Sequence, residues 1–126
     1  MILAIDVGNT NIVFGCIEGG ETSLVFRMVT DLIKTESEYA VGIKSILDFE
    51  GIRCDRFEGA ILSSVVPPLS SVITSAIKKV TGIHPLVVGA GVKTGLNILI
   101  DDPAQLGGDL VAAGVGAMSI YPLPLI

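Results

Sequence analysis

A short acidic, glycine-containing segment near the amino terminus places the strongest constraint on this chain. An apolar run, residues 1–5, ends at Asp6, and Gly8 and the polar residues 9–11 follow before a second apolar run begins. Glycine lets the backbone approach a phosphate closely, a carboxylate can position Mg²⁺, and amide and hydroxyl groups can donate hydrogen bonds to phosphate oxygens. The segment therefore predicts a strand that ends at a site for a phosphate and its metal. An ordinary β-hairpin with a polar turn is the alternative interpretation of the same residues.

Length and charge narrow the class of protein. A chain of 126 residues is about the size of one domain and can bury a real core. Its net charge of -5 and pI of about 4.6 argue against a nucleic-acid surface, which needs a basic patch, so we expect no nucleic-acid partner. The hydrophobic content of 50% and the mean hydropathy of +0.73 are high for a free-standing soluble domain. We therefore expect part of its apolar surface to be covered by something outside these residues.

The apolar segments do not have the form of secretion signals or membrane spans. Asp6 interrupts the first apolar run, and no basic residue precedes it. The longest uncharged stretch, residues 59–77, contains Pro67 and Pro68 at its centre and five serines, so it cannot be one continuous apolar helix. The sequence therefore predicts a cytoplasmic protein with no membrane partner.

The hydrophobic patterns predict three strands followed by alternating helices and strands. Thr35 and Glu38 form a capping-box pattern, and apolar residues then recur at helical spacing towards Gly51. Pro67 is a suitable first residue of a second helix, which we expect to run to about Val80. The predicted strands are residues 2–6, 11–18, 23–30, 60–66 and 85–88, of which the first three are antiparallel neighbours. The predicted order is β-β-β-α-β-α-β.

A last helix is predicted from Asp102 to about Ser119 and is unusually rich in glycine. It contains the glycines 107, 108, 114 and 116. Because each glycine costs roughly 1 kcal/mol relative to alanine in a helix, close approach by another backbone or by a ligand is the better explanation for them. Asp109 lies among these glycines, where a bound molecule could reach its carboxylate. A solvated helix carboxylate is the alternative interpretation.

The sequence lacks the motifs of several common classes of enzyme and binding site. There is no G-x-x-x-x-G-K-[ST] loop, no G-x-G-x-x-G after a strand, no protein-kinase signature and no G-x-S-x-G elbow. His84 is the only histidine, which excludes a site with several histidine ligands for zinc. Cys16 and Cys54 have no metal-binding spacing, and we expect both to be reduced and structural.

Four short motifs, in order along almost the whole chain, resemble the N-terminal half of type III pantothenate kinase. They are DVGNTN at residues 6–11, LSSVVP at residues 62–67, TGL at residues 94–96, and DP at residues 102–103 leading to GGD at residues 107–109. The resemblance implies an α/β fold of the ribonuclease H-like, actin-like ATPase type, with a mixed sheet flanked by helices. In this family two similar domains each contain the β-β-β-α-β-α-β core.

The resemblance also implies a reaction and the residues that serve it. The family transfers the γ-phosphoryl group of ATP to the primary hydroxyl of pantothenate, the first step of coenzyme A synthesis, using Mg²⁺ and a monovalent cation, K⁺ or NH₄⁺, and its members are homodimers. The implied ATP-binding residues are Asp6, Val7, Gly8, Asn9, Thr10, Asn11, Ile12 and Val13, with Asp6 acting on Mg²⁺. The implied pantothenate-binding residues are Gly107, Gly108, Asp109 and Leu110, with Asp109 as the proton acceptor.

Two positions depart from the family pattern, and the chain matches only part of the family's length. Leu110 stands where an arginine is common, and Ile100 where many members have a tyrosine, so two polar contacts to pantothenate are in question. We expect residues 1–120 to form the first domain and residues 121–126 to begin a linker into a second domain. That domain would carry the adenosine contacts, most of the cation site and much of the dimer interface. The first domain alone is expected to be inactive or nearly so.

Two other functions are compatible with the same motifs. One is a non-catalytic relative that binds a nucleotide and regulates a partner. The other is a small-molecule kinase of the same superfamily with a different acceptor. Substitution of Asp109 distinguishes the first alternative from a pantothenate kinase, and a panel of acceptors distinguishes the second.

Overall fold

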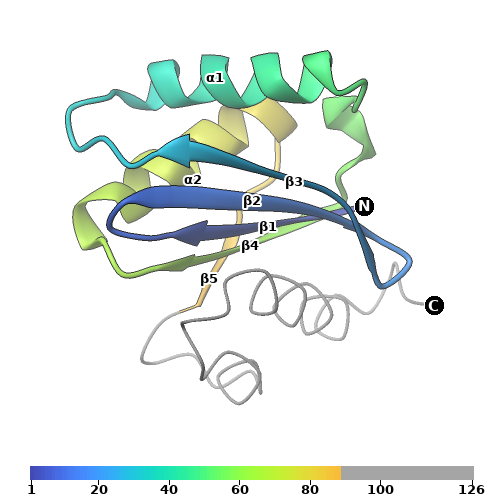
Figure 1. The fold of residues 1–126 in the computed structure, drawn as a ribbon, viewed down its shortest axis with the longest axis horizontal. Coiled ribbons are helices and arrows are strands. Elements are labelled where there is room, and N and C mark those ends of the chain that lie inside the picture. Colours follow the sequence, from blue (N-terminus) through green and yellow to red (C-terminus); the bar gives the residue numbers. More distant parts are fainter. Residues whose placement is uncertain (89–126) are drawn as a thin grey trace.

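The computed structural model describes residues 1–88, which form a five-stranded sheet and two α-helices (Figure 1). The strands are β1 (Ile2–Val7), β2 (Asn11–Glu18), β3 (Glu21–Val29), β4 (Gly59–Ser64) and β5 (Leu86–Val88). The helices are α1 (Glu36–Phe49), a short 3₁₀ turn η1 (Cys54–Arg56) and α2 (Pro67–Thr81). This order confirms the predicted β-β-β-α-β-α-β arrangement over the described part of the chain.

The sheet is mixed, with the strand order β3-β2-β1-β4-β5. Strand β2 pairs antiparallel with β1 and with β3, whereas β1 pairs parallel with β4, and β4 pairs parallel with β5. Both α-helices lie on the same face of the sheet (Figure 1). The parallel strands β1 and β4 therefore end side by side, at the edge of the sheet where the β1–β2 turn lies.

Alternation along β1 assigns its side chains to the two faces of the sheet. Leu3, Ile5 and Val7 are fully or almost fully buried and belong to the core beneath the helices, whereas Asp6 points to the other face. The rings of Phe14 and Phe26 stack in the same core with their centroids 4.7 Å apart. The helices contribute the following buried residues to it: Tyr39, Ala40, Ile43, Leu47, Leu69, Ile73, Ala76 and Ile77. The acid predicted to hold a metal is thus at the end of a strand that the core fixes firmly.

Local signals define the ends of both helices. The hydroxyl of Thr35 accepts a hydrogen bond from the Glu38 amide at 3.2 Å, and the Glu38 carboxylate accepts one from the Thr35 amide at 3.0 Å, so the predicted capping box is present. Helix α2 has Pro67 in its first turn and ends at Gly82, whose φ of 79° is in the left-handed region.

Two strand boundaries differ from the prediction by two residues, and the others agree to within one residue. Strand β3 begins at Glu21, two residues before the expected start, because Gly19 and Gly20 adopt positive φ angles and complete the turn by themselves. Strand β4 ends at Ser64 and not at Val66. The Ser64 hydroxyl accepts a hydrogen bond from the Val66 amide at 3.0 Å and so replaces a bond of the sheet. The predicted helix at residues 102–119 lies outside the described residues.

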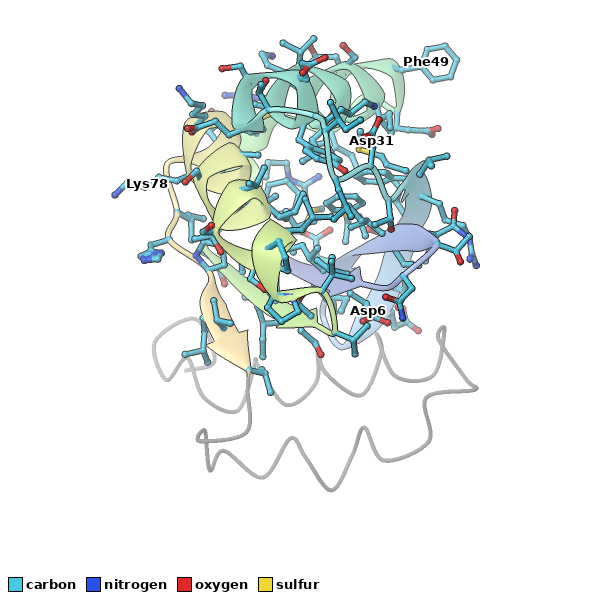
Figure 2. All side chains as sticks on the ribbon, turned by 90° about the vertical axis from the view of Figure 1, so that its left-hand side faces the viewer. Asp6, Asp31, Phe49 and Lys78 are labelled. Atoms are coloured by element: carbon cyan, nitrogen blue, oxygen red, sulfur yellow. The ribbon has the colours of Figure 1, made fainter. Side chains whose placement is uncertain are left out.

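Some apolar side chains of the described part are exposed. Phe49 at the end of α1 is 88% exposed and projects away from the fold (Figure 2), and Ile33 in the loop before α1 is 89% exposed. Scattered exposed apolar residues are normal on soluble proteins, so these two do not by themselves define an interface. The expectation that another part of the protein covers such surface stays a prediction.

Cys16 and Cys54 are free thiols, and burial raises the pKa of Cys16 to about 12, so it remains protonated at neutral pH. No three His, Cys, Asp or Glu side chains within residues 1–88 come together as a metal cluster. Neither α-helix of this part has the length and apolar character needed to span a membrane.

Candidate phosphate-binding loop

The candidate site is the turn between β1 and β2, at the carboxyl end of β1. Asp6 is half-buried and lies at the edge of the sheet far from α1 (Figure 2). The strand register places Asp6 between Val13 on β2 and Ser63 on β4. Because cross-strand partners project from the same face, the hydroxyl-bearing Ser63 and the carboxylate of Asp6 are direct neighbours there.

Gly8 makes the turn tight. Its amide donates a hydrogen bond of 3.0 Å to the carbonyl oxygen of Asn11, which closes the turn. A Cβ atom at Gly8 would lie only 3.0 Å from that same carbonyl oxygen, so any other residue would displace the loop backbone. Glycine therefore suits this position because the backbone at residue 8 lies so close to the Asn11 carbonyl oxygen.

Thr30, which the sequence analysis did not identify, holds this loop from the end of β3. Its hydroxyl donates a hydrogen bond of 2.7 Å to the carbonyl oxygen of Gly8, and its amide donates one of 3.0 Å to the carbonyl oxygen of Thr10. Two loop carbonyls are thereby turned towards Thr30. Repulsion between carbonyl oxygens and a bound anion is reduced when those oxygens are fixed elsewhere.

The amides at the tip of the loop are left open by this arrangement. Asn9 and Thr10 are exposed, and within residues 1–88 neither backbone N–H donates a hydrogen bond. Successive free amides in a tight turn form a concave site that suits phosphate oxygens. The side chains of Asn9 and Thr10 add further donors. The loop therefore has the donors that a phosphate requires and a backbone fixed in advance.

A buried tyrosine connects the loop to helix α1. The Tyr39 hydroxyl donates to the carbonyl oxygen of Asp31 at 2.8 Å and accepts from the Asp31 amide at 2.9 Å. Burial raises the pKa of Tyr39, so the hydroxyl keeps the proton that it donates. Because Asp31 follows Thr30 directly, this pair of hydrogen bonds fixes the residue next to Thr30, which braces the candidate loop. The core helix and the loop are thus mechanically connected.

The end of β4 supports the other side of the site. The amide of Val65 donates a hydrogen bond of 3.0 Å to the carbonyl oxygen of Val7, and the Ser64 hydroxyl donates to the carbonyl oxygen of Val66 at 3.1 Å. These contacts explain part of the LSSVVP motif at residues 62–67. Ser64 shapes the turn into α2, whereas Ser63 lies beside Asp6.

The donor set at the loop fits Mg²⁺ accompanied by a nucleotide. Mg²⁺ is commonly bound by one or two carboxylates together with substrate phosphates and water, and does not need a cage of protein ligands. Asp6 is a carboxylate at the mouth of a loop with free amides, and within residues 1–88 it belongs to no group of three or more His, Cys, Asp or Glu side chains that could hold a metal by themselves. This is the arrangement expected when phosphate oxygens complete the metal's coordination.

The structure separates the predicted ATP-binding residues into two groups. Asp6, Gly8 and the exposed tip of the loop surround the candidate site, whereas Val7 and Ile12 are fully buried in the core and Val13 is 1% exposed. The latter three can therefore serve a ligand only through their backbone or by positioning their neighbours. The predicted substrate residues Gly107, Gly108, Asp109 and Leu110 lie outside the described residues, as does Ile100.

The fold is that of the α/β domains found in actin-like ATPases and sugar kinases. A solved structure from Porphyromonas gingivalis, of a proposed N-acetylglucosamine kinase, superposes with a TM-score of 0.56 and 16% sequence identity over 81% of this chain. The chain spans only 38% of the length of that structure. At this identity the likeness establishes the fold and not the substrate.

The sequence comparison identifies the family. The profile of the type III pantothenate kinases matches residues 2–126. The chain belongs to the type III pantothenate kinase family, which confirms the resemblance drawn from its motifs.

Proposed function

We propose that this protein transfers the γ-phosphoryl group of ATP to pantothenate and forms 4'-phosphopantothenate, the first product of coenzyme A synthesis. The observation that carries the proposal is the family match over residues 2–126. The loop at residues 8–11 supports it, because a preformed phosphate site is what such a transfer needs. Phosphoryl transfer relies mainly on positioning and on charge neutralisation.

The described residues would position the nucleotide. The amides of Asn9 and Thr10 would bind phosphate oxygens, and Thr30 would keep the loop in its binding conformation. Asp6 would hold Mg²⁺ beside those phosphates. When bound, Mg²⁺ neutralises negative charge on the phosphate oxygens. The loop pays little ordering entropy on binding, since its hydrogen bonds already exist in the free protein.

The family match suggests the roles of the later residues. Asp109 would accept the proton of the pantothenate hydroxyl, and Gly107, Gly108 and Leu110 would contact pantothenate. A carboxylate of ordinary pKa, about 4, is sufficient because the proton moves late in a loose transition state. Residues 1–120 as one domain followed by a linker, the cation K⁺ or NH₄⁺, the homodimer and the cytoplasmic location remain predictions of the family resemblance.

The proposal is tested by product formation. The protein expressed from its complete coding sequence is incubated with Mg·ATP and pantothenate, and the phosphorylated product is identified by mass spectrometry. N-acetylglucosamine is included as an alternative acceptor because of the structural likeness to a proposed kinase of that sugar. We expect phosphorylation of pantothenate alone. Preferred phosphorylation of another acceptor, or binding of ATP without any transfer, would contradict the proposal.

Replacement of the predicted proton acceptor separates catalysis from regulation. Asp109→Asn should lower kcat on the order of 100-fold or more while the affinity for Mg·ATP is retained. Asp48→Asn is the matched control, because Asp48 is an exposed acid that pairs with Lys44 on α1. An Asp109→Asn variant with the turnover of the control would show that this acid is not the proton acceptor.

A further inference from the structure

An arginine on strand β3 lies in the same row of the sheet as Asp6. Asp6 pairs with Val13 on β2, and Val13 pairs with Arg27 on β3. The three residues therefore project from one face, with the Arg27 and Asp6 backbones two strand spacings, or about 10 Å, apart. Arg27 follows the alternation of β3, in which Phe26 and Met28 face the core and Arg27 faces away.

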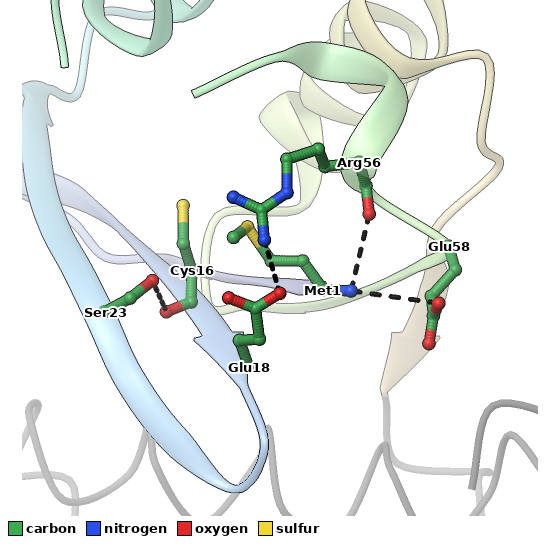
Figure 3. A network of polar contacts seen from close by, with 6 residues as sticks. All are labelled: Met1, Cys16, Glu18, Ser23, Arg56 and Glu58. Carbon is green, nitrogen blue, oxygen red and sulfur yellow. Dashed lines mark hydrogen bonds and ion pairs between the residues drawn. The ribbon is translucent and has the colours of Figure 1, made fainter. Parts of the chain in front are cut away.

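Arg27 has no partner within residues 1–88. It forms no ion pair and no side-chain hydrogen bond there, and it is exposed. The two other arginines of this part are both engaged: Arg53 pairs with Asp55, and Arg56 pairs with Glu18 (Figure 3). An arginine placed on a regular strand without a carboxylate partner is free to bind an anion from solution.

The phosphate loop lacks a positive charge of its own. Residues 6–13 contain no lysine or arginine, and Asp6 adds a negative charge. A triphosphate keeps excess negative charge after one Mg²⁺ is bound, so further cationic contacts are needed to hold it. Val13, which stands between them in the row, has a short side chain, and the long stem of Arg27 is able to reach past it and bring the guanidinium towards the loop. Lys34 is a poorer candidate, because its ammonium lies 5.5 Å from the centre of the Tyr39 ring, on the helix side of the sheet.

We propose that Arg27 binds the β- or γ-phosphate of ATP from the neighbouring strand. This inference rests on the proposed ATP site at the β1–β2 loop and adds to it a specific cationic residue. A guanidinium can donate two parallel hydrogen bonds to one phosphate, which also fixes the orientation of the phosphate. Arg27 is then a phosphate-binding residue and not part of the pantothenate site.

Nucleotide titrations of three variants test the assignment. Calorimetry is performed on the protein expressed from its complete coding sequence with Mg·ATP and with adenosine. Arg27→Gln should raise the Kd for Mg·ATP about 10- to 100-fold and leave the Kd for adenosine unchanged, because only the phosphate contact is lost. Arg27→Lys should give an intermediate Kd for Mg·ATP, since it retains the charge but not the two-pronged geometry.

Arg53→Gln is the matched control, because it removes an exposed arginine that already has an acidic neighbour. Its Kd for Mg·ATP should equal that of the unmodified protein. Equal Mg·ATP affinity of the unmodified protein and Arg27→Gln would overturn this inference while leaving the proposed function standing. Failure of the unmodified protein to bind Mg·ATP would overturn both. Melting temperatures of the variants verify that any loss of affinity is not a loss of fold.

Discussion

Polar groups lie at both ends of strand β1, but they pair with other protein groups to different extents. At the Met1 end, the α-amino group lies 3.8 Å from the Glu58 carboxylate and donates to the Arg56 carbonyl oxygen at 3.4 Å, and the Arg56 guanidinium pairs with Glu18 (Figure 3). At the Asp6 end, hydrogen bonds from Thr30 fix the loop carbonyls and leave the loop amides open. Charges at the first end pair with each other, whereas within residues 1–88 the amides of Asn9 and Thr10 at the second end have no hydrogen-bond acceptor.

The comparison shows that a cavity lined by charged residues is not by itself evidence for a ligand-binding site. A cavity of about 310 Å³ lies at the Met1 end, lined by Glu18, Glu50 and Arg56 among others. Its arginine is already paired, so an entering anion would have to displace a carboxylate. The Asp6 end offers backbone amides whose positions are set in advance by the fold. Preorganised and unsatisfied donors are the better indicator of function.

The largest effect is expected from Asp6, because its acid is proposed to hold the metal. Asp6→Asn should lower kcat/KM by about 100-fold or more and weaken the binding of Mg·ATP, since an amide oxygen neutralises Mg²⁺ poorly. Steady-state kinetics over a range of Mg²⁺ concentrations, together with calorimetry, measure this. Asp48→Asn again serves as the control. Unchanged Mg²⁺ dependence in Asp6→Asn would remove Asp6 from the metal site.

The next largest effect is expected at Gly8 in the β1–β2 turn, and Gly20 in the β2–β3 turn is its comparison. Gly8→Ala should weaken Mg·ATP binding roughly tenfold or more, because the new Cβ would push the Asn11 carbonyl and displace the loop. Gly20→Ala should instead lower stability by about 1–2 kcal/mol through its φ of 81°, without affecting nucleotide affinity. Calorimetry and chemical denaturation of both variants separate the two mechanisms. The comparison fails if Gly20→Ala weakens binding as much as Gly8→Ala does.

A smaller effect is expected when the brace of the loop is removed. Thr30→Val deletes the hydroxyl that donates to Gly8 and should weaken Mg·ATP binding several-fold, with a stability loss of about 1 kcal/mol. Thr81→Val deletes a hydroxyl at the end of α2 that donates to the Ile77 carbonyl oxygen at 2.8 Å and accepts from the Ile83 amide at 3.1 Å. It should cost at least as much stability as Thr30→Val and leave Mg·ATP binding unchanged. Denaturation and nucleotide titration of the pair provide the measurement. Equal Mg·ATP affinities of the two variants would show that the Thr30 hydroxyl does not hold the loop in its binding conformation.

The smallest effect is expected at the paired end. Glu18→Gln removes the partner of Arg56 on the surface, where both side chains are about half exposed. Solvent and salt screen such a pair, so the stability loss should be about 0–1 kcal/mol, and nucleotide affinity should not change. Urea denaturation at low and high salt tests the first statement, and calorimetry tests the second. A clear change in Mg·ATP affinity would show that the two ends of β1 are coupled.

Local sequence patterns predicted the elements of the fold because they depend on neighbouring residues. The apolar run before Asp6 predicted β1, the capping box at Thr35 predicted α1, and Pro67 predicted the start of α2. The boundaries that were wrong depend on single contacts that a pattern does not contain. At Ser64, one hydroxyl takes the amide that would otherwise extend β4.

The candidate site was predicted only where its residues are contiguous. The loop at residues 8–11 could be identified from its composition, but the brace from Thr30 could not, since Thr30 is 22 residues from Gly8. Its position depends on how β2 and β3 pair, including a shift of register between Cys16 and Ile17. The row that joins Arg27 to Asp6 depends on the same pairing. The roles proposed for residues 107–110 rest on the family resemblance.

The most direct test of the central claim is a nuclear magnetic resonance titration of the ¹⁵N-labelled protein with Mg²⁺ and a non-hydrolysable ATP analogue. The claim is that the loop between β1 and β2 is a preformed phosphate site. The account predicts that the amide resonances of Asn9 and Thr10 shift on binding, with little change at Glu18 and Arg56. The claim would be contradicted if the analogue saturated the protein and the amide resonances of Asn9 and Thr10 did not shift.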